Sequence, residues 1–85
     1  IGKQLVEKKL VACVNISKID SIYSWKGKIE NDSEYLAIFK TTKKNQVSLK
    51  NEIKKLHPYD VPEIAEITVN SMNKPYLDWL VDSTN

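Results

Sequence analysis

An α+β fold, with one antiparallel sheet covered by helices on one face, is predicted from three features of this sequence. Two runs rich in β-branched and aromatic residues, 10–25 and 29–41, flank a Lys-Gly-Lys turn. Two further stretches, 1–9 and 42–56, carry apolar residues at helical spacing. A third alternating run, 64–70, follows a proline-rich turn. Because no linker or repeat separates these segments, the whole chain is expected to form a single domain.

Composition narrows the functional classes. The 85 residues are 41% hydrophobic, enough for one small core, and the net charge of +2 is carried on lysine without any arginine. This argues against a dedicated nucleic-acid reader, since arginine is the side chain that grips phosphates and guanine edges bidentately. A single cysteine excludes an internal disulfide and favours a cytoplasmic location. No apolar run reaches the ~18 residues of a membrane span, so no membrane partner is expected.

The first half of the chain reads as a helix followed by a hairpin. In segment 1–9, Ile1, Leu5 and Val6 fall on one helical face. Segment 10–25 reads as one long bent strand that loosens over 17–20. The strand that returns after the turn is expected to contain a loop or bulge at 31–33.

The second half reads as helix, strand and short helix. Thr42 is the expected N-cap of a helix that runs to about Leu56. Segment 64–70 alternates as a strand. Pro75 is expected to open a terminal helix over 76–81. That helix would dock three apolar side chains, namely Leu77, Leu80 and Val81.

This order of elements lacks only one strand, before Ile1, of the βαββαβ pattern of a ferredoxin-like sandwich. The sequence therefore predicts that fold with a central sheet position left empty. Either further residues precede Ile1 in the native protein, or a neighbouring molecule fills the gap.

Segment 56–63, Leu-His-Pro-Tyr-Asp-Val-Pro-Glu, concentrates the only histidine and two of the three prolines. Proline disfavours a helical conformation for the residue before it, so His57 is expected to end the helix and Val61 to be extended. The result is a stiff turn that displays an imidazole, a phenol and two carboxylates. Such a turn serves either as a binding edge or as a structural corner.

Five blocks of the sequence, in this order and spacing, resemble the CutA family of divalent-cation tolerance proteins. They are Leu-Val-Ala-Cys-Val-Asn-Ile at 10–16, Ile-Tyr-Ser-Trp-Lys-Gly-Lys-Ile-Glu at 22–30, Phe-Lys-Thr-Thr at 39–42, His-Pro-Tyr-Asp-Val-Pro-Glu-Ile at 57–64 and Tyr-Leu-Asp-Trp-Leu at 76–80. The resemblance covers essentially the whole chain.

The resemblance implies a ferredoxin-like protomer in a tight homotrimer, with strands pairing across subunits, similar to PII signalling proteins. It also implies a role in tolerance and binding of divalent metals, chiefly copper; animal members are associated with anchoring of acetylcholinesterase. Family members often carry a His-His-Pro-Tyr motif. In this chain Leu56 takes the place of the first histidine of that motif. This chain also starts after the strand that carries the cysteine implicated in metal binding. Only His57 maps onto the implicated ligands, and Cys13 occupies a different position.

His57 is accordingly the candidate metal ligand, for Cu²⁺ or another divalent cation, with Asp60 or Glu63 as a nearby oxygen donor. The structural alternative is an imidazole that caps the helix end and packs on Tyr59. Cys13 lies in an apolar strand and is expected to behave as a small inert hydrophobe.

A second candidate site is a pocket between subunits, in which Lys40 receives an anion and aromatic side chains form the walls. Its residues are Tyr23, Trp25, Lys40, Tyr59 and Glu63. The alternatives are interface packing for the two strand aromatics, Tyr23 and Trp25, and a solvated or acid-paired Lys40.

Two functions follow from these candidates. The first is a non-enzymatic, trimeric protein of metal homeostasis that binds a divalent cation through His57. The second is a PII-like trimer that senses a small anion without any metal. An enzyme has the least support, because no nucleophile and base are paired by the spacing.

Overall fold

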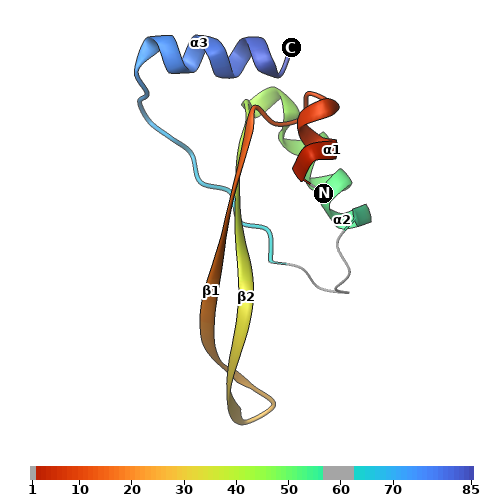
Figure 1. Cartoon of the computed structure of the whole chain (residues 1–85), viewed down its shortest axis with the longest axis vertical. Coiled ribbons are helices and arrows are strands. Elements are labelled where there is room, and N and C mark those ends of the chain that lie inside the picture. Colours follow the sequence, from red (N-terminus) through yellow and green to blue (C-terminus); the bar gives the residue numbers. More distant parts are fainter. Residues whose placement is uncertain (1, 57–62) are drawn as a thin grey trace.

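The computed structural model describes residues 2–56 and 63–85. A long antiparallel hairpin projects from a group of helices, and the molecule measures 46 × 26 × 19 Å (Figure 1). The elements in chain order are α1 (Gly2–Glu7), β1 (Cys13–Trp25), β2 (Lys28–Lys40), the 3₁₀-helix η1 (Lys43–Asn45), α2 (Gln46–Leu56) and α3 (Lys74–Ser83). The predicted α+β class is confirmed, and the sheet in the described part of the chain has two strands.

The hairpin is regular along its whole length. Its register runs from Cys13 opposite Lys40 to Trp25 opposite Lys28, with every residue between them paired one to one. The expected loop or bulge at 31–33 is therefore wrong. A local polar Asn-Asp-Ser sequence was outweighed by thirteen consecutive cross-strand pairs, which are the unit of sheet stability.

The turn at the hairpin tip explains this regularity. Lys26 and Gly27 both have positive φ, 50° and 78° respectively. Two central residues with positive φ match the right-handed twist of the strands that they join, and glycine adopts this conformation at little cost. The turn predicted at 26–28 is thus confirmed, with its two central residues at 26 and 27.

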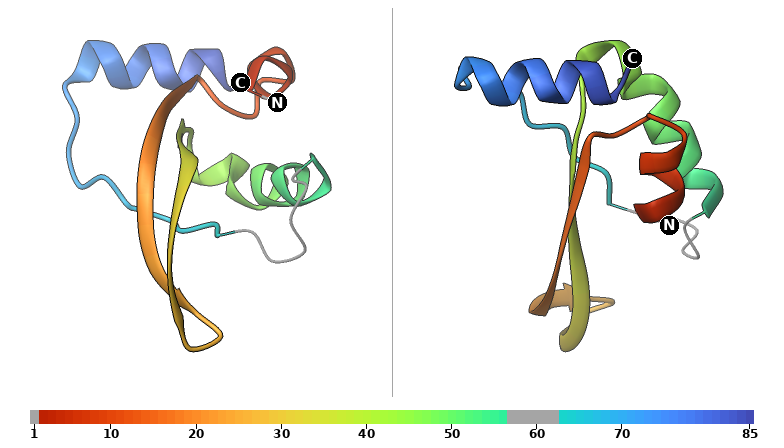
Figure 2. Two further views of the ribbon diagram at one scale, coloured as in Figure 1. Left: turned by 60° about the horizontal axis from the view of Figure 1, so that its bottom comes forward. Right: turned by 45° about the horizontal axis from the view of Figure 1, so that its top comes forward.

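The hydrophobic core lies where α1 and α2 cover one face of the base of the hairpin (Figures 1 and 2). Four buried side chains form its centre, and four partly buried ones pack against them. The central residues are Leu5, Val11, Leu49 and Ile53, and the surrounding ones are Leu10, Val14, Phe39 and Ile64. Of the face predicted for the first helix, Leu5 enters this core, whereas Val6 is exposed and Ile1 lies outside the described residues. Two hydrogen bonds connect the segment before β1 to the end of β2 at the edge of this core. Thr41 Oγ1 donates to the Leu10 carbonyl at 2.6 Å, and the Ala12 amide donates to the Lys40 carbonyl at 2.8 Å.

The predicted second helix is confirmed with a different start. Thr42 is extended, as an N-cap residue is, but its side chain makes no capping hydrogen bond. The chain first forms the 3₁₀ turn η1 and then continues as α2 to Leu56. Lys54 and Lys55 lie in the last turn, where positive charge complements the helix dipole.

The strand predicted at 64–70 is wrong. This segment passes the hairpin without forming a ladder with it, and Ile67 is 88% exposed (Figure 1). Alternating apolar residues favour a strand only when a neighbouring strand is at hand to accept and donate backbone hydrogen bonds. In the described residues the segment is attached instead through Ile64 at the core and through an ion pair between Lys50 and Glu66.

Helix α3 lies across the helical end of the molecule (Figure 2). Pro75 is at its start, as predicted, but the helix runs two residues further than expected at each end. Of the three side chains predicted to dock, only Leu80 is confirmed. Leu80 and Thr84 are buried, whereas Leu77 and Val81 remain about 40% exposed. No helix in residues 2–56 and 63–85 is long and apolar enough to cross a membrane.

Candidate functional site

The predicted site residues fall into three groups. His57, Tyr59 and Asp60 lie outside the described residues, and Glu63 is the first residue after that interval. Tyr23 and Trp25 lie near the tip of the hairpin. Lys40 lies at its base, under α3.

At the tip, Tyr23 belongs to a row of polar cross-strand contacts. Its hydroxyl donates a hydrogen bond to the Asp32 carboxylate at 2.5 Å, and Ser21 donates similarly to Glu34 at 2.6 Å. The hydrogen bond to Asp32, with smaller contributions from desolvation and from the charges of Asp32, Glu34 and Glu30, raises the pKa of Tyr23 to about 12. The raised pKa means that this contact favours the protonated phenol, which donates to the Asp32 carboxylate.

Trp25 ends β1 and is 59% exposed. Its ring is covered on one side by the ammonium of Lys26, which lies 5.8 Å from the ring centroid. An exposed indole with a cation beside it is suited to contact another surface.

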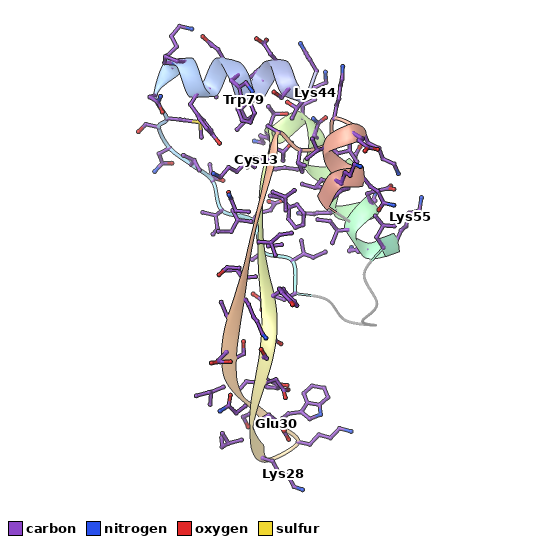
Figure 3. The ribbon with its side chains drawn as sticks, viewed as in Figure 1. Cys13, Lys28, Glu30, Lys44, Lys55 and Trp79 are labelled. Atoms are coloured by element: carbon purple, nitrogen blue, oxygen red, sulfur yellow. The ribbon has the colours of Figure 1, made fainter. Side chains whose placement is uncertain are left out.

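At the base, Lys40 is half-buried and pairs with Cys13 across the hairpin. Its ammonium lies 5.7 Å from the centroid of the Tyr76 ring, and the Tyr76 ring is 5.4 Å from that of Trp79, tilted by 52°. Trp79 points from α3 toward the start of β1, where Cys13 lies (Figure 3). The aromatic partners of Lys40 are thus on α3, and the sequence reasoning did not assign them to any site. The i, i+3 spacing of Tyr76 and Trp79 was the available signal, because it places both rings on one side of a helix.

The two ends of the hairpin cannot contribute to one pocket of the same chain. Tyr23 and Cys13 are separated by ten strand residues, which at ~3.3 Å per residue is roughly 33 Å. A pocket that contains both Tyr23 and Lys40 therefore requires residues from two copies of the chain. Such a pocket is the one that the sequence predicts between subunits.

Cys13 is half-buried, and its thiol lies 3.7 Å from the side-chain oxygen of Asn15. A divalent cation bound by nitrogen, oxygen or sulfur donors needs several of them converging on one point. In the part of the chain that the structure describes, no three His, Cys, Asp or Glu side chains converge in this way. The metal ligands implied by the sequence would have to come from the 57–62 turn, from further copies, or from both.

The comparison with protein families decides the affiliation. The sequence profile of the CutA1 divalent ion tolerance protein matches residues 1–83. This chain belongs to the CutA1 family.

Individual CutA1 relatives agree with this assignment. The divalent-cation tolerance protein CutA of Thermotoga maritima is 46% identical over 83 residues, which cover 98% of this chain and 82% of that protein. The fold is similar to the solved structure of the periplasmic divalent cation tolerance protein CutA from Archaeoglobus fulgidus, with a TM-score of 0.92, 40% identity and coverage of 98% and 81% of the two chains. It is also similar to the PII-like protein CutA from Nostoc sp. PCC 7120 in apo form, with a TM-score of 0.90, 36% identity and coverage of 99% and 83%.

Proposed function

We propose that this chain is a trimeric binding protein of divalent-cation tolerance, in which His57 and the turn around it contact a cation such as Cu²⁺. The observation that carries the proposal is the match to the CutA1 family over residues 1–83. A CutA relative that is 46% identical supports it. Those relatives are named for tolerance of divalent cations, and the match includes the only histidine of the chain.

The chemistry of the turn supports this role. A neutral imidazole is a ligand for copper or zinc, and Asp60 or Glu63 would add an oxygen. One imidazole alone holds a cation weakly, and Leu56 stands where a second histidine would be. Three copies around a threefold axis would supply three imidazoles, so we propose that the metal site and the trimer depend on each other.

Exposed apolar residues on the hairpin support a homotrimer. The register places Ile16, Ile22, Ile29 and Tyr35 on one face of the hairpin, the same face that carries Val14 and Phe39 into the core nearer the base. Ile22, Ile29 and Tyr35 are all more than 70% exposed. A long two-stranded sheet with free edges and an apolar face is an aggregation hazard unless something covers it. We propose that neighbouring copies cover it, and that in the assembled protein the sheet reaches the ferredoxin-like arrangement.

Calorimetric titration with Cu²⁺ and Zn²⁺ tests the metal role. Binding should be saturable in the wild type and strongly reduced in His57→Ala. Cys13→Ala is the matched control, because it removes the single thiol of the chain and leaves the His57 turn intact, and it should bind like the wild type. Equal binding by wild type and His57→Ala would remove His57 from the site, and loss in Cys13→Ala alone would transfer the role to the thiol.

Light scattering tests the assembly. We expect the mass of three chains at micromolar concentration, and a shift to smaller species in Ile22→Lys or Ile29→Lys, which would bury an unpaired charge in the interface. Ser48→Lys on the exposed side of α2 is the control and should stay trimeric. A wild-type monomer at micromolar concentration would contradict both the proposed trimer and the proposed metal site shared by its subunits.

A PII-like anion sensor is the second candidate. It is favoured by the likeness to the Nostoc protein and by the half-buried Lys40 beside aromatic rings. The proposed pocket would join Lys40 and Glu63 of one copy to Tyr23 and Trp25 of another, with Tyr59 in its wall. Anion binding that persists in EDTA and disappears with the trimer would favour this candidate over the metal one.

We propose a binding role rather than catalysis, because none of the matched residues pairs a nucleophile with a base. We also propose a cytoplasmic location, which the single cysteine favours. The Archaeoglobus relative is called periplasmic, so cell fractionation is the appropriate test of location.

A further inference from the structure

The charged residues of this chain are divided unevenly between its helical layer and the rest of the molecule. We define the helical layer as residues 2–9 and 43–56, which include α1, η1 and α2. It contains eight of the thirteen lysines and only two of the eleven acidic residues, whereas the rest of the chain holds five lysines and nine acidic residues. The net charge of +2 therefore conceals a strongly basic layer, and such asymmetry favours a partner with extended negative charge.

The two acidic residues of the helical layer are already paired with lysines of the same layer. Glu7 lies 3.9 Å from Lys3, and Glu52 accepts from Lys8 and lies 3.8 Å from Lys55. Four exposed lysines of the layer form no ion pair with any carboxylate that the structure describes. They are Lys9, Lys43, Lys44 and Lys54.

The fold brings three of these four lysines to one corner of the layer. Lys43 and Lys44 begin η1, and the side-chain amide of Asn45 donates to the carbonyl of Lys9 at 3.4 Å. This contact joins segments that are 36 positions apart in the sequence. Figure 3 shows Lys44 at the end of the layer that adjoins α3 and Lys55 at the opposite end, so positive charge extends along the whole of α2.

The outer side of α2 also carries an apolar side chain between these lysines. Val47 is 71% exposed, although Leu49 and Ile53 on the other side of the same helix are buried in the core. Lys54 follows Val47 by seven residues, or about two helical turns, and therefore lies on the same side. Lysines that surround an exposed apolar side chain are typical of a helix that rests on the surface of a membrane.

The composition of the layer fits a lipid surface better than a nucleic acid. The chain has no arginine to grip single phosphates bidentately. The aromatic residues that the structure describes lie on the hairpin and on α3, so the layer offers no ring for base stacking. Lysine ammonium groups respond instead to the diffuse field of an anionic bilayer. The sequence predicts no membrane partner because no segment could span a bilayer, but attraction to a surface needs no such segment.

We propose that the outer side of the helical layer binds the surface of an anionic lipid bilayer. The four lysines without ion pairs lie near the lipid headgroups, and Val47 enters between them. This function goes beyond cation tolerance. It uses none of the residues assigned to the His57 site or to the anion pocket, and it leaves the hairpin available to other copies of the chain.

Co-sedimentation with lipid vesicles in the presence of EDTA tests the proposal. Vesicles with equal parts of phosphatidylcholine and phosphatidylglycerol should retain the wild type at low ionic strength and release it as added salt screens the charges. Vesicles of phosphatidylcholine alone should not retain it. Each lysine close to an anionic bilayer raises partitioning by about fivefold, so Lys44→Gln/Lys54→Gln should lower it by about thirtyfold.

A matched variant separates the helical layer from net charge. Lys28→Gln/Lys74→Gln removes two exposed lysines from outside the layer and should partition nearly as the wild type does. Equal losses in the two double variants would assign the effect to net charge and overturn the proposal. Val47→Ser keeps every charge and should still weaken partitioning, because the apolar contact is lost.

The choice of lipid as the partner is tested separately. Equal retention by vesicles of phosphatidylcholine alone, or no retention by the anionic vesicles, overturns the proposal. Tighter binding to polyuridylate than to vesicles at the same phosphate concentration would overturn lipid in favour of nucleic acid. His57→Ala should bind the vesicles as the wild type does, so failure of the metal site and failure of the lipid surface are distinguishable.

Discussion

The hydroxyl of Tyr23 donates a hydrogen bond to Asp32, which is not the residue directly opposite it on the hairpin. The opposite residue is Glu30, and Asp32 lies two positions further along β2. Ser21 and Glu34 repeat the same diagonal offset on the same face. Long side chains reach diagonal neighbours of this kind, and the two contacts link the strands where the hairpin is far from the core.

Titration of Tyr23 should reveal this link. We expect its pKa to be about 12 in the folded protein and to fall toward the ordinary value of 10.0 in Asp32→Asn. The raised pKa means that the interaction stabilises the fold fully below pH 10 and loses this effect as the pH rises through 12. Ultraviolet titration of phenolate absorbance, with Tyr23→Phe to identify the transition, measures it. Asp20→Asn on the other face is the control, and a fall in the Tyr23 pKa there as large as in Asp32→Asn would contradict the assignment.

Glu52 connects α2 to the end of α1. It accepts a hydrogen bond from Lys8 and lies 3.8 Å from Lys55. The bond from Lys8 is the main cause that lowers the pKa of Glu52 below its ordinary value of 4.5, with the charges of Lys55 and Lys8 adding to it against desolvation. A lowered pKa stabilises the fold above pH 4.5, and that effect is lost as the pH falls through the folded-state value.

Denaturant unfolding at pH 7 and at pH 3.5 should therefore show a smaller pH effect in Glu52→Gln than in the wild type. Glu7→Gln is the matched control. Its partner Lys3 is 3.9 Å away with both side chains well exposed, and such pairs contribute little. A pH dependence that is unchanged in Glu52→Gln would argue against the α1–α2 link.

The core should be sensitive to single methyl groups. Leu5 is fully buried, and Leu5→Ala is expected to reduce the free energy of unfolding by ~2–5 kcal/mol, which is enough to unfold a small domain. Ile53→Val removes a single methylene and should cost ~0.5–1.5 kcal/mol, a change that remains measurable by urea unfolding. Val6→Ala, on the exposed side of α1, should change stability by about 0.5 kcal/mol or less. Comparable losses from Val6→Ala and Ile53→Val would mean that α1 does not pack as described.

Asn45 should determine how firmly α3 is attached. Its side-chain amide reaches the carbonyls of Lys9 and Thr84, which belong to segments far apart in the sequence. Asn45→Ala should cost ~0.5–1.5 kcal/mol for the Thr84 bond and should increase amide hydrogen exchange selectively in α3. Asn51→Ala on the exposed side of α2 is the control. Uniform exchange changes across the hairpin and α3 alike would indicate a global effect instead.

Several parts of the fold could be predicted because their signals are local. The apolar spacing in α1 and α2, the turn glycine at 27 and the β-branched strand residues each act through neighbours in the sequence. The loop or bulge predicted at 31–33 is absent because cross-strand pairing continues through these residues, and Asp32 accepts a hydrogen bond from Tyr23. The docking residues of α3 were predicted only in part. Leu77, Leu80 and Val81 are equally apolar, but only Leu80 is buried in the folded chain.

The candidate site residues were likewise predicted only in part. The residue types that bind cations and anions are visible in the sequence, and so is the family to which the chain belongs. Which of them meet is decided by the tertiary structure: a straight hairpin carries Tyr23 and Lys40 to opposite ends, and α3 brings Tyr76 to Lys40. Segment 64–70 has the alternation of a strand but no ladder, because backbone hydrogen bonds require a partner that local pattern does not contain. The sequence by itself thus determined the helices, the hairpin and the chemistry of the side chains, whereas long-range pairing and packing decided which strands form and which side chains meet.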